Sequence, residues 1–216
     1  MYSDANRWEQ LILSHMSNLR ILDIQYDNII IDNHNGNQVI SNTPIDNFTS
    51  SFWIKRRIIP LKQLTKLVVE SNPLPLTKLI ELLRCTPHIH TLVLKSMSLY
   101  GVNYNSIQQN QSFQLVSSTN TITHVTYEGK CTLEKLQILI ALFSQIEHLT
   151  IDLHDKDFKS CIRFLLEKTN RNTNNLCSLC LLSVKNIWRT GLKTLIESET
   201  LLDDYMLKIN NKHLYL

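Results

Sequence analysis

The chain has 216 residues, of which 43% are hydrophobic and 19% charged, so it can bury a sizeable core and is not a disordered tail. The formal net charge of +3 is too small to predict nucleic-acid binding, and no apolar run approaches the ~20 residues of a membrane span. The sequence has only 4 glycines and neither a GxGxxG nor a GxxxxGKS/T motif, which argues against a glycine-rich phosphate loop.

The sequence is typical of an intracellular protein. Residues 1–15 contain no basic region followed by an apolar stretch and so do not predict a signal peptide. Five cysteines, an odd number without the spacing of a small disulfide scaffold, suit a reducing compartment. We therefore expect a cytoplasmic or nuclear protein with a single domain over residues 1–216.

A repeated strand motif runs along the chain. Leucine and isoleucine contribute 35 and 23 residues, and the pattern L-x-x-L-x-L, with Ile, Val or Tyr allowed, recurs. There are six copies and a looser seventh, which are Leu19/Leu22/Ile24, Leu64/Leu67/Val69, Ile89/Leu92/Leu94, Ile122/Val125/Tyr127, Ile146/Leu149/Ile151, Leu176/Leu179/Leu181 and Leu202/Tyr205/Leu207. Their first positions are 45, 25, 33, 24, 30 and 26 residues apart, and all but the first interval are close to the roughly 20 to 29 residues of leucine-rich repeats.

Helices are predicted between the strand motifs. Apolar residues recur there at helical spacing in four stripes, Leu76/Leu79/Ile80/Leu83, Leu133/Leu136/Ile140/Phe143, Phe158/Cys161/Ile162/Leu165 and Leu192/Leu195/Ile196. Trp8, Leu11 and Ile12 predict a further helix before the first strand, whereas the polar residues 105–118 show no clear stripe. Each unit is a strand followed by a helix, and the units must stack because one alone cannot bury its apolar face.

Two regions depart from this pattern. The interval at about 25–60 is too long for one unit, and we expect a loop over the polar residues 33–47 and then an irregular or extra strand with partly buried aromatic residues at 48–54. Residues 205–209 and 213–216 flank Asn210-Asn211-Lys212, which predicts a carboxyl-terminal hairpin at about 205–216 that closes the sheet edge.

The predicted fold is α/β, an open curved leucine-rich-repeat solenoid with a parallel sheet on the concave face, helices on the convex face and a terminal β-hairpin. The last two positions of each strand motif should face the helices. The residues predicted to be buried there are Leu67, Val69, Leu92, Leu94, Val125, Tyr127, Leu149, Ile151, Leu179 and Leu181.

The strand motif followed by a helix resembles the irregular, cysteine-containing leucine-rich repeats of F-box proteins. The segments that carry the resemblance best are Asn18-Leu19-Arg20-Ile21-Leu22, His88-Ile89-His90-Thr91-Leu92 and Gln145-Ile146-Glu147-His148-Leu149. The layout is also similar to F-box-type proteins expanded in bdelloid rotifers, in which a Trp-containing helix precedes a strand motif, as residues 8–22 would here, and a short hairpin ends the chain. The F-box itself, a helical segment with a Leu-Pro signature, is not found in this sequence.

This resemblance implies a non-catalytic protein–protein interaction module that recognises substrates for a cullin-type ubiquitin ligase. The partner on the concave face would be an unknown protein, and the ligase adaptor would bind only through the missing F-box. The alternative is a stand-alone leucine-rich-repeat scaffold or inhibitor with no ligase link. A third hypothesis, an unrecognised enzyme, has no GxSxG or HExxH motif to support it.

Cysteines and basic residues offer few sites for chemistry. Cys177-Ser178-Leu179-Cys180 has the CxxC form of zinc and redox sites, but residues three apart in a strand face opposite sides, so we expect a structural role, with zinc binding and redox activity as alternatives. Cys85, Cys131 and Cys161 fall at helix ends or on a helix stripe, where cysteine acts as a small hydrophobe. We expect Lys55-Arg56-Arg57 to be a solvated strand end, and no metal or cofactor to be bound.

Outward positions of the central strands form the candidate binding surface. Equivalent residues of neighbouring units should stand about 4.8 Å apart, pairing His124 with His148, Thr126 with Thr150, and Glu128 with Asp152. The histidine pair could bind a metal, titrate and contact a partner, or simply face solvent. The residues predicted to contact a partner are Lys66, Val68, Glu70, Thr91, Val93, Lys95, His124, Thr126, Glu128, His148, Thr150 and Asp152.

Overall fold

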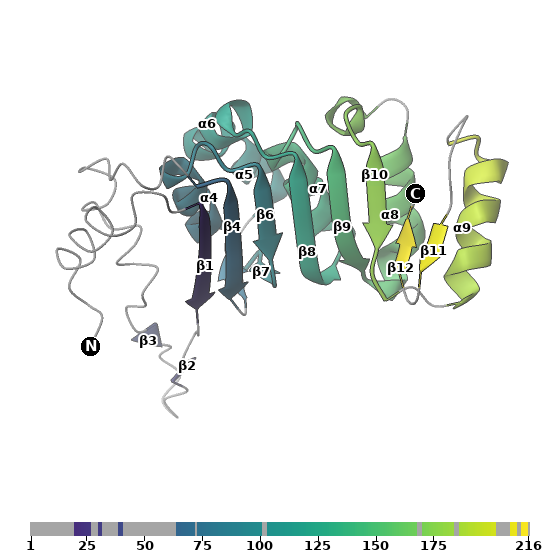
Figure 1. The fold of residues 1–216 in the computed structure, drawn as a ribbon, viewed down its shortest axis with the longest axis horizontal. Coiled ribbons are helices and arrows are strands. Elements are labelled where there is room, and N and C mark those ends of the chain that lie inside the picture. Colours follow the sequence, from purple (N-terminus) through teal and green to yellow (C-terminus); the bar gives the residue numbers. More distant parts are fainter. Residues whose placement is uncertain are drawn as a thin grey trace.

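The structure is a computed structural model that describes residues 20–26, 30–31, 39–40, 64–71, 73–100, 103–167, 170–183, 186–201, 208–210 and 213–215. Over these residues the protein is α/β, with an eight-stranded, mostly parallel sheet and helices packed along it (Figure 1). The strand order, β1-β4-β6-β8-β9-β10-β12-β11, is open. The predicted α/β class with a parallel sheet is therefore confirmed.

Six parallel strands follow one another in sequence order. They are β1 (Ile21–Tyr26), β4 (Lys66–Ser71), β6 (Thr91–Leu94), β8 (His124–Cys131), β9 (His148–Leu153) and β10 (Ser178–Leu181). Each of them pairs in parallel with the next. The long interval after β1 does not interrupt the sheet, because Leu22 of β1 lies opposite Leu67 of β4.

One hydrogen-bond pattern recurs where each later parallel strand begins. The Arg20 carbonyl accepts hydrogen bonds from the backbone N–H groups of Thr65 and Lys66, at 2.8 and 3.2 Å. The carbonyls of Thr65, His90, Thr123 and Glu147 make the same bifurcated contact, always to the residue before the following strand and to the first residue of that strand. The intervals between these acceptors equal those between the first five strand motifs, so units of unequal length share one local geometry.

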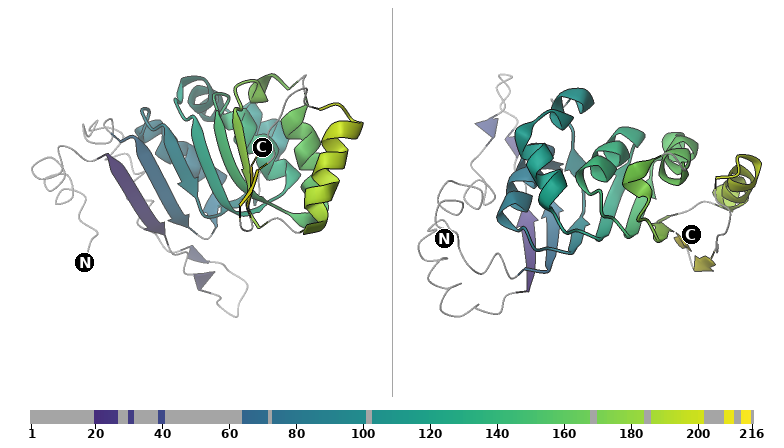
Figure 2. Two further views of the ribbon diagram at one scale, coloured as in Figure 1. Left: turned by 45° about the vertical axis from the view of Figure 1, so that its right-hand side comes forward. Right: turned by 90° about the horizontal axis from the view of Figure 1, so that it is seen from above.

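The helices connect successive strands. They are α4 (Leu76–Cys85), α5 (Tyr104–Gln108), α6 (Gln111–Thr119), α7 (Leu133–Leu142), α8 (Phe158–Leu166) and α9 (Asn186–Ser198), with 3-10 turns η2 (Asp155–Asp157) and η3 (Arg171–Thr173). Figure 2 shows α4 to α8 on the same side of the sheet. Their apolar stripes face the strands, as Leu79 and Leu83 of α4 do, because both are at most 4% exposed.

Residues 105–118 lie in the two helices α5 and α6 except for the break at 109–110, although their sequence shows no clear apolar stripe. Asn110 caps α6, since its side-chain oxygen accepts hydrogen bonds from the N–H groups of Ser112 and Phe113 at 2.9 and 3.2 Å. Phe113 and Val116 are buried and attach α6 to the core. Two buried residues one turn apart suffice for packing, but they are too few to produce a recognisable periodicity.

The core lies between the sheet and these helices. Every residue predicted to face the helices, from Leu67 to Leu181, is at most 2% exposed, so the predicted phase of the strands is confirmed. Tyr127 is fully buried, and its hydroxyl oxygen accepts hydrogen bonds from the Met97 N–H at 3.2 Å and the Lys135 ammonium at 3.3 Å. A polar group at this depth therefore keeps its hydrogen bonds, which limits the cost of burying it.

Side chains in the loops join neighbouring units. The buried Asn120 donates hydrogen bonds to the carbonyls of Val116 and Leu142, at 2.7 and 2.9 Å, and its oxygen accepts one from the Ile122 N–H at 3.3 Å. Val116 belongs to α6 and Leu142 to α7, so one amide satisfies carbonyls at the ends of two helices. This contact fixes the spacing between the two units.

A hairpin closes the carboxyl end of the sheet, as predicted. β11 (Lys208–Asn210) and β12 (His213–Tyr215) pair antiparallel, and β12 also pairs antiparallel with β10. Two small sheets stand apart from the main one: β5 (Leu74–Pro75) pairs with β7 (Met97–Ser98), and β2 (Ile30–Ile31) with β3 (Val39–Ile40). Since β3 lies within the predicted loop at 33–47, that prediction was wrong in part.

Some predictions fall outside the described residues. They concern the helix around Trp8, the aromatic segment 48–54, the basic cluster 55–57 and the seventh motif copy, which begins at Leu202. Within the part of the chain that the structure describes, no helix has both the length and the apolar character needed to cross a membrane.

Candidate functional site: the open face of the sheet

We call the side of the sheet that α4 to α8 leave uncovered the open face. All the residues predicted to contact a partner lie on it. Along each strand its members alternate with buried residues. The exposed members are Glu70, Lys95, His124, Glu128 and His148, and the half-buried ones are Lys66, Val68, Thr91, Val93, Thr126 and Thr150. Asp152 differs from the others because it is buried, with 8% of the residue exposed.

The strand register arranges the open face in rows that cross the sheet. The row at the amino-terminal ends of the strands contains Lys66, Thr91, His124, His148 and Ser178. The next row contains Val68, Val93, Thr126, Thr150 and Cys180. The predicted neighbours His124/His148 and Thr126/Thr150 are thus confirmed.

His124 and His148 form a stacked pair. Their ring centroids are 4.3 Å apart and the ring planes are inclined by 31°. The Thr123 hydroxyl lies 2.9 Å from Nδ1 of His124, which leaves Nε2 of that ring as its other polar atom. Both rings are exposed, so this pair can hydrogen-bond at the surface.

The predicted pairing of Glu128 with Asp152 is wrong. β8 and β9 stay in register as far as Tyr127 and Ile151, and the register then shifts so that Lys130 lies opposite Asp152. Residues 128 and 129 form a bulge in β8 that has no counterpart in β9. A bulge of two residues preserves the alternation of faces, so Glu128 stays exposed on the open face but loses its expected neighbour.

Gly129 allows the bulge to pack closely against the loop after β6. A Cβ atom placed on Gly129 would lie 2.7 Å from the Lys95 carbonyl oxygen and 3.3 Å from the Tyr127 hydroxyl oxygen. The nearer contact is to backbone, which cannot rotate away as a side chain can. Only glycine therefore fits at this position without a shift of the loop after β6.

Lys130 and Asp152 form an ion pair across the bulge, with 2.8 Å between Nζ and Oδ1. The Asp152 side chain is 12% exposed and that of Lys130 is 53% exposed. Lysine thus carries its charge to a carboxylate that is largely withdrawn from water, and the hydrogen bond offsets part of the desolvation cost. Asp152 is therefore tied to the sheet itself and offers little surface to a partner.

The cysteines of the CxxC motif lie in different surroundings. Cys177 is exposed and directly precedes β10, whereas Cys180 lies within β10 and is 8% exposed. The Cys177 thiol donates a hydrogen bond to the Asn175 carbonyl at 3.3 Å. The prediction that both cysteines belong to one strand is corrected for Cys177.

Two further cysteines are buried between units. Cys131 ends β8 rather than lying at a helix end or on a helix stripe, and Cys161 lies in α8. Burial raises the pKa of each thiol to about 12. Both thiols therefore stay protonated at neutral pH, and cysteine acts there as a small apolar residue.

Four residues that the sequence analysis did not assign also lie on the open face, including Ile21, which is 56% exposed and lies opposite Lys66. Lys130 was missed because a bulge leaves no mark in an alternating pattern. Ser178 and Cys180 could have been found, since they alternate with Leu179 and Leu181 of the sixth motif copy. Among the described residues, no three or more His, Cys, Asp or Glu side chains form a group that could hold a metal ion.

The open face combines imidazoles, hydroxyls, methyl groups and charges of both signs. These groups can make hydrogen bonds, apolar contacts and ion pairs with a protein surface. No protein-family model matches the sequence, and no curated protein matches it. The open face is therefore interpreted from its own geometry and charge.

Proposed function

We propose that this chain is a non-catalytic protein-binding module of the leucine-rich-repeat class, an open curved solenoid that binds a partner on the open face. The observation that carries the proposal is the bifurcated hydrogen bond repeated at the start of five successive strands. Stacked units with this shared geometry set one outward side chain beside the next, about 4.8 Å apart. Such a surface can be read by a partner that crosses several strands.

The chemistry of the open face supports protein contact. Its middle row presents methyl groups from Val68, Val93, Thr126 and Thr150, all half-buried, and charged residues lie beyond it. An apolar strip bordered by charges resembles the arrangement of protein interfaces, in which a drier centre is surrounded by a polar rim. Specificity would then come from complementary charge around the strip.

Photo-crosslinking tests this proposal. In one variant, a benzophenone amino acid replaces Glu128 on the open face. In the matched control it replaces Gln114 on α6, which is also exposed. We expect the first variant to capture a defined protein in cells and the control not to. The captured protein should then bind the unsubstituted chain, and Thr126→Arg with Thr150→Arg should weaken that binding at least tenfold. Equal binding by this double variant, or capture through position 114 alone, would contradict the proposal.

We further propose that the partner is a substrate of a cullin-type ubiquitin ligase, with this chain as the recognition region of an F-box-type receptor. The support is the resemblance of the strand motifs to those of F-box proteins. The test is a pull-down of the ligase adaptor with residues 1–216 and with any version extended upstream in the reading frame. We expect only an extended version to bind. An extension without an F-box, or one that does not bind, would favour a stand-alone scaffold or inhibitor.

A further inference from the structure

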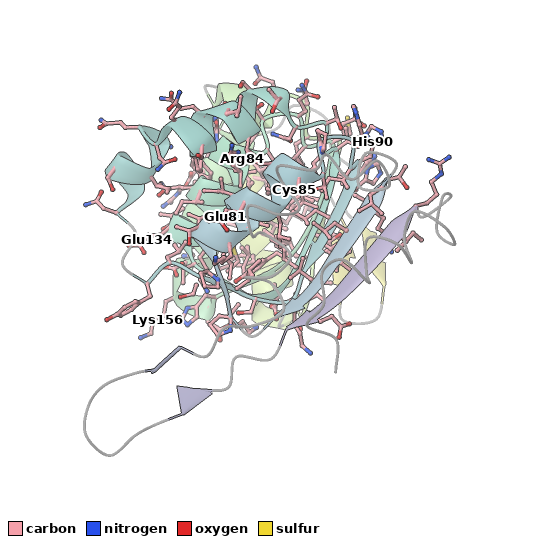
Figure 3. All side chains as sticks on the ribbon, turned by 90° about the vertical axis from the view of Figure 1, so that its left-hand side faces the viewer. Glu81, Arg84, Cys85, His90, Glu134 and Lys156 are labelled. Carbon is pink, nitrogen blue, oxygen red and sulfur yellow. The ribbon has the colours of Figure 1, made fainter. Side chains whose placement is uncertain are left out.

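Histidines gather at the amino-terminal ends of three neighbouring strands. His88 and His90 precede β6, His124 opens β8 and His148 opens β9. These are four of the eight histidines in the chain, and all four are exposed. We call them the histidine rim. Figure 3 shows His90 at the end of the sheet opposite to the end that carries Glu134 and Lys156.

The members of the histidine rim are held in place relative to one another. The His90 carbonyl accepts a hydrogen bond from the His124 backbone N–H at 3.0 Å, and the rings of His124 and His148 stack at 4.3 Å. Nδ1 of His90 lies 3.0 Å from the Thr121 carbonyl oxygen, so the ring donates a hydrogen bond there. The ring of His90 and the stacked rings of His124 and His148 are therefore each tied to a neighbouring unit.

The charges around the histidine rim are mostly positive. Among the described residues, Lys66 of β4 lies in the same row and Arg20 precedes β1, so both add positive charge. Glu147, directly before β9, is an exposed carboxylate next to the rim, and the thiol of Cys177 precedes β10. At the other end of the open face the charges are mixed, being Glu70, Lys95, Glu128 and the paired Lys130 and Asp152. The end of the open face that carries the histidine rim is therefore more positively charged than the other end.

We propose that the histidine rim and Lys66 dock an acidic segment of the protein partner, and that this docking strengthens as the pH falls from 8 to 6. The inference rests on the proposed function, because it names the chemistry of the partner for the same face. Imidazoles take up protons in this pH range, and each proton adds a positive charge facing the bound carboxylates. A carboxylate ligand in turn favours the protonated imidazole, so proton uptake and docking support each other.

The dimensions of the row fit a short extended peptide. Lys66 and His148 are separated by three strand spacings, which amounts to about 14 Å. An extended chain covers that distance in about four residues. An acidic segment of four to five residues that crosses the strands could therefore reach Lys66 at one end and the stacked imidazoles at the other.

Fluorescence anisotropy with a labelled deca-glutamate peptide tests the inference. Measured at low salt with the full chain, the affinity should be about fivefold higher at pH 6 than at pH 8, from the gain of two or three exposed ion pairs. Salt at about 0.5 M should remove the difference, since it screens exposed charges. A deca-lysine peptide should not bind at either pH.

Three variants identify the source of the pH dependence. His88→Gln, His90→Gln, His124→Gln and His148→Gln combined should bind deca-glutamate equally at both pH values, because glutamine cannot be charged. His124→Lys with His148→Lys should bind more tightly at pH 8 than the unsubstituted chain does. His154→Gln, at the carboxyl-terminal end of β9, is the matched control and should retain the full pH dependence. Thermal unfolding of each variant verifies that it is folded.

Two results would overturn the inference. One is an affinity for deca-glutamate that does not change with pH, including no measurable binding, and the other is a pH dependence that survives in the variant with glutamine at all four histidines of the rim. The proposed function would stand after either result if the protein captured through position 128 still bound Thr126→Arg with Thr150→Arg more weakly than the unsubstituted chain. Loss of that second effect, with deca-glutamate binding intact, would instead refute the open face as the partner surface while keeping the acidic site.

Discussion

The two sides of the central sheet are made by the same strands but follow different physical constraints. On the helix side, residues such as Leu92 and Leu149 are at most 1% exposed, and close packing allows little change in volume. On the open face, Thr91 and Thr150 are only half-buried and their neighbours are polar. The helix side therefore determines whether the chain folds, and under the proposed function the open face determines what it binds.

The difference between the sides is sharpest in β8 and β9. Val125 and Tyr127 keep their inward positions, which the motif defines. The outward positions change partner after Tyr127, where the bulge at residues 128 and 129 brings Lys130 opposite Asp152. Apolar periodicity thus constrains the helix side throughout, whereas the open face depends on register, which one local insertion can alter.

Truncation on the two sides of one strand should give the largest contrast. Leu149→Ala removes a side chain that is 1% exposed and should lower the free energy of unfolding by roughly 2 to 5 kcal/mol. Thr150→Ala, the next residue but on the open face, should cost less than about 1 kcal/mol. Urea denaturation of both variants measures the difference. Similar losses for the two would contradict the assignment of the sides.

A pair of glycine substitutions tests the bulge. Gly129→Ala should destabilise the protein by about 1 to 3 kcal/mol, because the added Cβ would lie 2.7 Å from the Lys95 carbonyl oxygen. Gly191→Ala in α9 meets no atom within 4 Å and should instead stabilise it by about 0.5 to 1 kcal/mol, since alanine favours helix. Denaturant midpoints should therefore move in opposite directions. A neutral Gly129→Ala would mean that the bulge is not packed as described.

Removing the cation that pairs with the buried Asp152 should have an intermediate effect. Lys130→Met leaves the Asp152 carboxylate without its 2.8 Å partner and should cost about 1 kcal/mol. Glu128→Met, at the exposed bulge position without that partner, is the control and should change stability by less than about 0.5 kcal/mol. If Glu128 rather than Lys130 lay close to Asp152, Lys130→Met would cost little and Glu128→Met would stabilise the protein by relieving repulsion between two carboxylates.

The smallest effect should come from the exposed ion pair between α8 and the end of α9. Nε of Arg163 donates hydrogen bonds to both carboxylate oxygens of Glu199 at 2.9 and 2.8 Å, which holds the pKa of Glu199 below its usual value. A lowered folded-state pKa contributes stability above the ordinary carboxyl pKa, and this is lost as the pH falls through the lowered value. Glu199→Gln should therefore be slightly less stable at pH 7 and equal to the unsubstituted chain near pH 2, as thermal unfolding can measure. A difference that persists at pH 2 would contradict this origin.

The sequence predicted the helix side of the sheet better than the open face. Six copies of one motif were sufficient to identify the parallel strands, their order and the buried residues, because burial repeats with the strand period. α6 was missed, since its capping Asn110 and two buried residues stand among polar neighbours. The pairing of Glu128 with Asp152 failed because a bulge depends on tertiary packing against Lys95, which no local pattern records.

The stacked histidines show what the sequence could predict on the open face. His124 and His148 were predicted to lie side by side because they hold the same position in neighbouring motif copies. Both open their strands, before the bulge in β8 shifts the register. His90 was not included with them, since it lies one residue before the row and joins it through its backbone carbonyl. Matching positions in neighbouring motif copies therefore predict which residues lie opposite each other near the start of the strands, but not beyond the bulge.

Methyl NMR of the complex with the captured partner tests most directly that the open face is the binding surface. Val93 lies half-buried in the middle row of the open face, and Leu115 is 48% exposed on α6, on the helix side. Saturation of the partner's protons should transfer to the methyl groups of Val93 and Val68 and leave those of Leu115 unchanged. Transfer to Leu115 without transfer to Val93 would contradict the open face as the site of recognition.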